Sequence, residues 1–185
     1  LVLVVTAPAF IFFSQKGPGA MHAPWLISLA AGLVVGGLSQ FSRLCTVGGF
    51  RDLFLFKKSI LIFGYLAVLV GVFVVNISFG NFHLGFENQP IAHTDGLWNF
   101  LGMALAGFCS VLLGGCPLRQ LIMTGEGNSD SAVTVLGLAA GAAFAHNFGL
   151  AASGAGPTLN GQIAVGVGFV VALIIAILNT KRANA

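Results

Sequence analysis

The stretch WNFLGMALAGFCSVLLGGCPLRQLIM, residues 98–123, decides the fold, because an apolar, glycine-rich run leads through a break into a short segment with a cysteine and an arginine. The apolar run is close to the roughly 17–25 residues that a helix needs to cross a bilayer. The whole chain shares this character, since 57% of its 185 residues are hydrophobic and 7% are charged, against about 25% charged in soluble domains. So few charges cannot cover a water-soluble surface, and lipid is therefore the solvent for most of the protein.

Five apolar segments, this one included, define the architecture. Apolar segments of near-spanning length lie at 24–39, 59–80, 97–115, 132–151 and 161–179, with a truncated sixth at 1–13. We predict an all-α polytopic transmembrane helix bundle of about six spans, forming a single domain over residues 1–185. The abundant Gly and Ala let helices approach closely in lipid, which indicates tight packing. The opening LVLVVTAPAF has no Met and no basic region, so it is not a signal peptide, and we expect a fragment of a longer chain.

Lys and Arg are distributed unevenly between alternate loops. Residues 40–58 hold four, residues 116–131 hold one and the C-terminal tail holds two, whereas the opposite loops hold Lys16 alone. By the positive-inside rule we place Arg51, Arg119 and the tail in the cytoplasm of a bacterial cell, with the protein in its inner membrane. The residues then placed outside are His83, Glu87, His93 and Asp95. A net charge of +3 is too small and scattered to indicate nucleic acid as a partner.

An internal repeat is visible in the order of features. The first copy contains WLISLAAGLVVGGLSQFSRLCTVGGFRDLFLF, residues 25–56, and the second contains residues 98–123. Each runs from a Trp through a Gly-rich span to a Cys and a short piece with Arg-Asp or Arg-Gln, and each is followed by another span. The repeat units are about 24–80 and 97–151, and two like units predict a site between them. We expect Cys45 and Cys116 to approach one another near the centre of the bundle, closer to each other than either is to the loop histidines.

The break in the second copy has the features of a helix start. Gly114 and Gly115 permit a sharp turn out of the preceding span, and proline suits the first position of a helix. We therefore predict a short helix from Pro117 to about Thr124 with Cys116 as its N-cap. A helix N-terminus carries partial positive charge and free N–H groups, and it favours an anion or a thiolate beside it.

The first copy has equivalent parts. Cys45 follows directly after a span, with Thr46 as the expected cap and Gly48-Gly49 as a source of backbone freedom. Arg43 precedes the cysteine by two residues.

A charged pair follows at Arg51 and Asp52. Neighbours in sequence do not face each other on a helix, so we expect each of these two residues to pair with another group.

The inert alternatives stay open for each candidate. Cys109 is expected to be a small buried hydrophobe, and the same role is the alternative for Cys45 and Cys116. Arg51 and Arg119 either serve the site or snorkel at the membrane surface. The polar pair His146-Asn147 inside an apolar span either joins helices or lines a pathway.

No metal-binding or cofactor-binding pattern is present. The chain has no CxxC, HExxH or nucleotide-binding motif, and we expect no cofactor and no metal. His22, His83 and His93 are expected to be ordinary solvated residues. The segment TGEGNSD, residues 124–130, lacks the calcium-loop pattern and is expected to be a turn that caps the next helix.

The segments FSRLCTVGGFRD, residues 41–52, and GGCPLRQLIMTGEGNSD, residues 114–130, resemble motifs of the YeeE/YedE family of bacterial inner-membrane proteins. The resemblance runs from about 26 to 180, and the second segment looks like the YedE branch associated with selenium metabolism. The resemblance implies uptake of thiosulfate, or of a selenium compound, past cysteine thiols near short helices. It also implies that Cys45 and Cys116 are the motif cysteines and that the chain is the C-terminal half of a longer member.

Three functions are compatible with these residues. The first is transport of a small sulfur- or selenium-containing anion, with Cys45, Cys116, Gly114, Gly115 and the arginines in the path. The second is a covalent carrier, in which a thiolate takes up a sulfur or selenium atom for a cytoplasmic carrier protein. The third is a structural membrane subunit. No His or carboxylate is placed as a catalytic base, and we expect the protein not to be an enzyme.

Overall fold

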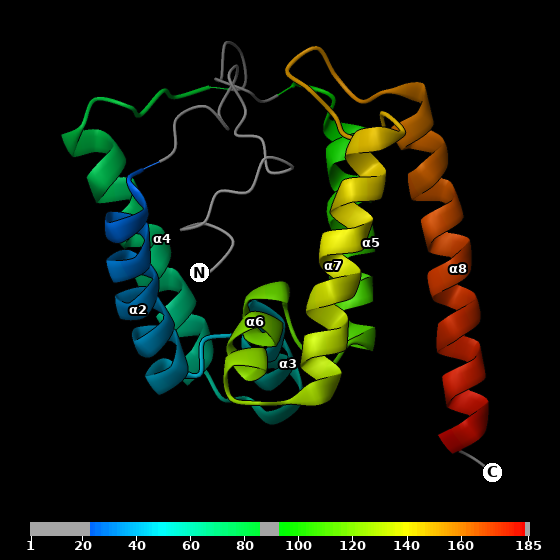
Figure 1. The fold of residues 1–185 in the computed structure, drawn as a ribbon, viewed down its shortest axis with the longest axis horizontal. Helices are drawn as coiled ribbons and strands as arrows, with labels where there is room; N and C mark the ends of the chain where they lie inside the picture. Colours follow the sequence, from blue (N-terminus) through cyan, green and yellow to red (C-terminus); the bar gives the residue numbers. More distant parts are fainter. Residues whose placement is uncertain (1–22, 86–92, 184–185) are drawn as a thin grey trace. The chain divides into compact units, whose positions relative to one another are not determined.

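The computed structural model describes residues 23–85 and 93–183, and most of these residues are helical (Figure 1). They form no β-strand beyond an isolated bridge between Ser153 and Gly156. The helices are α2 (Trp25–Ser42), α3 (Thr46–Phe56), α4 (Ile60–Ser78), α5 (Gly96–Leu112), α6 (Pro117–Gly125), α7 (Ser129–Asn147) and α8 (Leu159–Ala183). The all-α prediction is confirmed, and the order long, short, long recurs in α2–α4 and α5–α7.

Four helical segments in the described residues are long and apolar enough to cross a membrane. They are Trp25–Phe56, Ile60–Ser78, Gly96–Gly125 and Leu159–Thr180. Helix α7 was expected to be a fifth and is helical, but it is not among the four, because Ser and Asp residues begin it and His146-Asn147 end it. The expected partial span at 1–13, together with Lys16, His22 and Glu87, lies outside the described residues.

Contacts divide the chain into two compact units, residues 1–41 and 42–185. The first contains most of α2, an 18-residue helix that begins after Pro24 and whose leucine and valine side chains are largely exposed. Such exposure is normal for a helix whose solvent is lipid. The second unit contains α3 to α8 and both motif cysteines, so the candidate site is described within it alone.

Helices α3 and α6 are the short elements of the second unit, and each packs against the long helix that follows it (Figure 1). Helix α3 contacts α4 and also touches α5, α6 contacts α7, and α5 contacts α8. The α5–α8 contact is close enough that a Cβ added at Gly168 would lie 2.7 Å from Leu105 Cδ2. Small residues permit this approach in lipid, as the composition predicted.

The end of α5 is a glycine-dependent turn that aims the chain into α6. Gly114 has a φ of +75°, a left-handed conformation that glycine adopts without steric cost. Its N–H donates to the carbonyl of Val111, and the N–H of Gly115 donates to the carbonyl of Ser110, each at 3.1 Å. These two bonds form a Schellman motif, which satisfies carbonyls that the helix end would leave unpaired.

Candidate functional site

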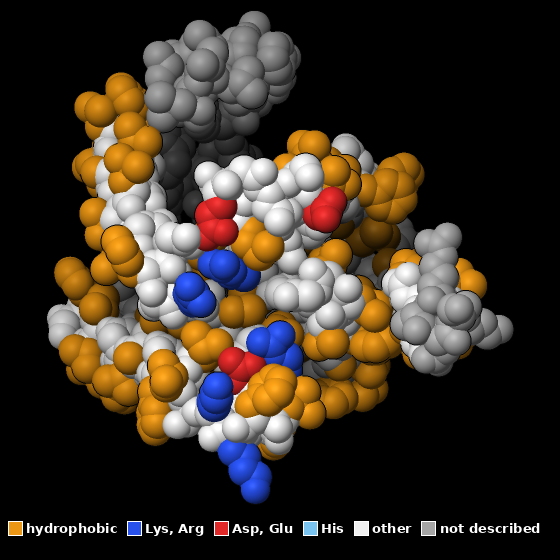
Figure 2. Space-filling model, turned by 90° about the horizontal axis from the view of Figure 1, so that it is seen from below, with side chains coloured by type: hydrophobic (Ala, Val, Ile, Leu, Met, Phe, Trp, Pro, Cys, Tyr) orange, Lys and Arg blue, Asp and Glu red, His pale blue; other side chains and the backbone are white. Residues whose placement is uncertain are grey.

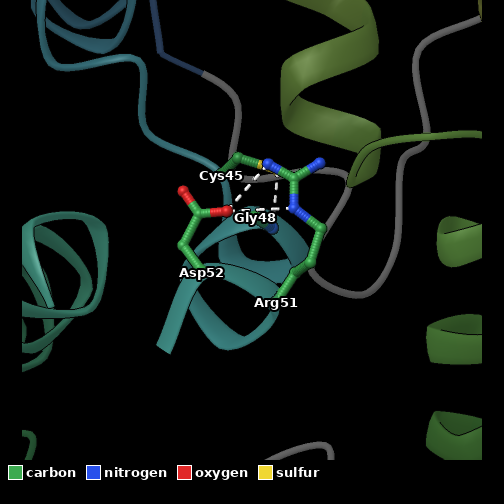
Figure 3. A network of polar contacts seen from close by, with 4 residues as sticks. All are labelled: Cys45, Gly48, Arg51 and Asp52. Carbon is green, nitrogen blue, oxygen red and sulfur yellow. Dashed lines mark hydrogen bonds and ion pairs between the residues drawn. The ribbon is translucent and has the colours of Figure 1, made fainter. Parts of the chain in front are cut away.

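Cys45 is the N-cap of α3 and is held there by a hydrogen bond from the helix (Figure 3). Its backbone is extended, with φ −152° and ψ 117°, and its sulfur accepts a hydrogen bond from the N–H of Gly48 at 3.3 Å. The expectation that Thr46 is the cap was wrong, because Thr46 is already the first helical residue. A cysteine at this position accepts the bond that Ser or Thr usually accepts at an N-cap.

Cys116 is the N-cap of α6, and Pro117 is the first residue of the helix, as predicted. The backbone of Cys116 is extended, with φ −69° and ψ 160°, and its side chain makes no capping hydrogen bond to α6. Its sulfur is instead faced by the N–H of Arg119 from its own helix and by groups of α3. The cap side chain is thus directed toward the other short helix.

The two cysteine thiols lie close to each other. The Cys45 thiol and the N–H and hydroxyl of Thr46 are neighbours of the Cys116 sulfur. Only 9% of Cys45 and 5% of Cys116 is exposed, and both are free thiols. The prediction that these two residues from separate repeat units approach one another is confirmed.

The surroundings of the thiol pair favour negative charge. The N-termini of α3 and α6 meet there, and each contributes partial positive charge and N–H groups that have no helical partner. The N–H groups of Gly48, Thr46 and Arg119 face the two sulfur atoms. Thiols are weak hydrogen-bond donors, so the pair can hold a polarisable anion without binding it tightly.

Gly48 and Gly49 provide space at the pair, and the expectation that they provide backbone freedom was wrong. Both are buried inside α3, and neither has a positive φ. A Cβ at Gly48 would lie 3.3 Å from the Cβ of Cys45, and a Cβ at Gly49 would lie 3.5 Å from the backbone nitrogen of Ile62. The absence of side chains therefore lets Cys45 and the start of α4 lie against α3.

Gln120 is a positioning residue that the sequence analysis missed. It is only 4% exposed, and its Nε2 donates a hydrogen bond to the carbonyl of Leu113 at 2.9 Å. This bond ties α6 back to the end of α5 and so fixes the turn that carries Cys116. The signal in the sequence was a glutamine within a short helix, where an uncharged polar side chain needs a partner once it is buried.

The arginines near the pair are paired with carboxylates on their own segments. The Nη2 and Nε atoms of Arg51 donate to Asp52 Oδ1 at 2.8 and 3.0 Å (Figure 3). The expectation that these neighbours do not meet was wrong, because a long guanidinium side chain can fold back along the helix surface to the next residue. Arg119 lies 3.6 Å from Glu126, across the end of α6.

Basic side chains gather on the face of the second unit where α3 and α6 lie (Figure 2). Arg43 is exposed and has a φ of +50°, and Lys57 ends α3 with a φ of +53°. Neither forms an ion pair with a residue that the structure describes. The Lys and Arg residues with described side chains are Arg43, Arg51, Lys57, Lys58 and Arg119.

Two other candidates lie away from the thiol pair. His146 and Asn147 are exposed at the C-terminal end of α7, about 25 Å along the helix from its start at 1.5 Å per residue. Asn147 donates to the carbonyl of Ala143 in its own helix. Cys109 is half-buried within α5 and is not among the groups that face Cys116. Their roles stay predictions.

Two smaller expectations are settled by the structure. Asn128 caps α7 by accepting a hydrogen bond from the N–H of Ser131 at 2.9 Å, which confirms the turn predicted over 124–130. His93 is half-buried, and its Nδ1 is buried without a hydrogen-bond partner among the described residues. The expectation that it is an ordinary solvated residue was therefore wrong, whereas His83 is exposed.

Membrane-spanning helices, together with two short helices that are each capped by a buried cysteine, define a multi-pass membrane protein with a candidate site for a soft anion. The family model described as sulphur transport matches residues 41–182. The chain therefore belongs to this family. It is the YeeE/YedE family, whose motifs the sequence resembles.

One curated relative is the thiosulfate transporter TsuA of Escherichia coli (strain K12). It is 29% identical over 111 residues, which cover 58% of this chain and 30% of the relative. The chain thus matches about a third of the length of that relative. No solved structure matches the chain. The family description and the name of the relative both concern transport and not catalysis.

Proposed function

We propose that this protein carries a small sulfur-containing anion, thiosulfate in the first place, across the bacterial inner membrane, and that Cys45 and Cys116 act as consecutive binding sites in the path. The observation that carries this proposal is the placement of two buried thiols close together at the N-termini of α3 and α6. The sulphur transport family of residues 41–182 supports the same class of substrate.

The physical argument concerns binding that is strong enough to admit the anion and weak enough to release it. A thiol donates a weak hydrogen bond, and sulfur is polarisable, as is the terminal sulfur of thiosulfate. The N–H groups that face the pair offset the charge of the anion without a fixed cation. A Cβ at Gly48 would lie 3.3 Å from the Cβ and 3.5 Å from the sulfur of Cys45, so there is little room beside this thiol, which disfavours a fully hydrated ion.

The basic face is proposed as the cytoplasmic mouth of the path. The positive-inside rule places its Lys and Arg residues on that side. Arg51 and Arg119 are each paired with a carboxylate, so their pull on an anion is reduced. Arg43, which has no ion pair among the described residues, is the arginine best able to attract the anion. A cytoplasmic sulfur or selenium carrier protein is the partner expected to receive it.

Selenium compounds are the second substrate class in this proposal. A selenium oxyanion shares the charge and polarisability on which the argument depends, and the segment at 114–130 resembles the branch associated with selenium metabolism. The thiol pair does not distinguish the two elements, so the substrate is assigned by comparing uptake of the two labelled anions in the experiment below.

The test is uptake of radiolabelled thiosulfate and selenite by cells that lack other uptake systems for these anions and produce either the parent or Cys116→Ser. Cys109→Ser is the matched control, because it also exchanges one sulfur for oxygen, at a site away from the pair. Serine keeps a hydroxyl donor but lacks the larger, polarisable sulfur, and we expect uptake by Cys116→Ser to fall at least about fivefold, which corresponds to about 1 kcal/mol. Cys109→Ser should retain parental uptake.

Membrane levels of the variants must be equal for the comparison to hold. Unchanged uptake in Cys116→Ser would refute the role of the thiol. A sulfur or selenium atom found covalently on Cys116 by mass spectrometry after transport would instead favour the covalent carrier.

A further inference from the structure

The thiol pair has a second chemistry, which does not depend on transport. Cys45 and Cys116 are free, buried and close together, and they cap two separate helices. Thiolate sulfur is the ligand that soft metal ions such as copper(I) prefer in proteins. Two thiols that are already neighbours need little rearrangement to bind one ion between them.

The number of available ligands selects the kind of metal. Among the residues that the structure describes, no group of three or more His, Cys, Asp or Glu side chains could hold a metal ion. Zinc takes four protein ligands in structural sites and three with an open position in catalytic sites, so the pair does not satisfy it. A monovalent ion with a filled d shell, copper(I) or silver(I), forms a stable complex with two thiolates in a linear, two-coordinate arrangement.

The charge of such a complex also matches the site. One copper(I) ion displaces the protons of two thiols, which leave to water, and a bis-thiolate complex of net charge −1 remains with copper still monovalent. The N–H of Gly48 donates to the Cys45 sulfur at 3.3 Å, and the N–H groups of Thr46 and Arg119 face the Cys116 sulfur. These donors at two helix N-termini stabilise a complex anion.

We propose that Cys45 and Cys116 form a two-coordinate site for a soft monovalent metal ion, copper(I) above all. This inference goes beyond the proposed transport and rests only on the geometry of the pair. Occupancy removes both S–H donors, so a bound ion would also block any anion that uses these thiols.

The test is a competition between the purified full chain in detergent and the copper(I) chelator bathocuproine disulfonate, without oxygen. We expect the parent to withdraw one copper(I) per chain. Even outer-shell partners of metal ligands account for about 10–100-fold in affinity, so Cys45→Ser and Cys116→Ser, which remove a direct ligand, should each lose at least about 100-fold. Cys109→Ser should bind as the parent does. Parental binding in either pair variant, or loss of binding in Cys109→Ser, would overturn the proposal.

A second measurement uses the parent alone and so does not depend on how the variants fold. The X-ray absorption spectrum of the copper(I)-loaded chain should show two sulfur neighbours. A parent chain that takes up no copper(I), or a spectrum with three or more ligands, would overturn the proposal. The outcome is separable from that of the transport experiment, because each test is read on its own: uptake that depends on Cys116 without copper binding refutes the metal site alone, and the reverse refutes the transport role alone.

Discussion

The turn at Gly114 offers a test of how the short helix α6 is positioned. Gly114 has a φ of +75°, and a Cβ added there would meet no atom within 4 Å. Any penalty for Gly114→Ala is therefore conformational, and the left-handed region costs a residue with a side chain roughly 1–2 kcal/mol. Alanine also restricts the unfolded chain, which offsets about 0.4–1 kcal/mol. The net expectation is a loss of stability of about 1 kcal/mol.

Its neighbour provides the matched control. Gly115 has no positive φ, and a Cβ there would lie 3.6 Å from atoms of Arg119 and Gln120, an ordinary van der Waals separation. Gly115→Ala should therefore change stability by no more than about 0.5 kcal/mol. Gly114→Asn should be less destabilising than Gly114→Ala, because asparagine adopts the left-handed conformation more readily.

The assay is thermal unfolding of the purified chain in detergent, followed by circular dichroism. A loss of about 1 kcal/mol corresponds to a fall in Tm of about 2–4 °C for a chain of this size. If Gly115→Ala lowers the Tm as much as Gly114→Ala, or if Gly114→Asn is no better than Gly114→Ala, the penalty is not the left-handed backbone and the reasoning is refuted.

Other substitutions test packing with the same assay. A Cβ at Gly161 would lie 2.5 Å from the carbonyl oxygen of Leu150. Backbone must then move, and Gly161→Ala should cost about 1–3 kcal/mol. Gly168→Ala meets only the end of a flexible leucine side chain and should cost less; the reverse order would contradict the contact geometry. Gln120→Leu leaves the carbonyl of Leu113 without its donor and should cost about 1–3 kcal/mol, so parental stability in this variant would show that the bond is unimportant.

The paired arginines illustrate where reasoning from local sequence fails. Helical spacing rules describe where Cβ atoms point, and by these rules Arg51 and Asp52 diverge. The side chain of arginine is long enough to reverse this direction, and the observed pair is 2.8 Å apart. With 58% of the Arg51 side chain exposed, the pair adds little stability, and its effect is to moderate the charge of the basic face.

The amino-acid sequence by itself determined the all-α membrane class, the helix from Pro117 to about Thr124 with its cap at Cys116, and the turn within 124–130 that caps the next helix. These features depend on composition, on the length of apolar runs and on local backbone preferences, all of which act within a few residues. Cys45 as the cap of α3 required the structure, because Thr46 has the better side chain for that role and only the backbone path shows which residue precedes the helix.

The tertiary structure decided what surrounds the two cysteines. The repeat predicted that Cys45 and Cys116 approach one another. The packing of α3 and α6 within the unit decided the rest: how close the two thiols lie, that Thr46 lies beside the Cys116 sulfur, and that Gln120 is buried. Contacts between residues about 70 positions apart depend on how whole helices pack, and no local pattern specifies them. The sequence therefore identified Cys45 and Cys116 as candidate site residues, and the tertiary structure determined that their sulfur atoms lie close together at two helix N-termini.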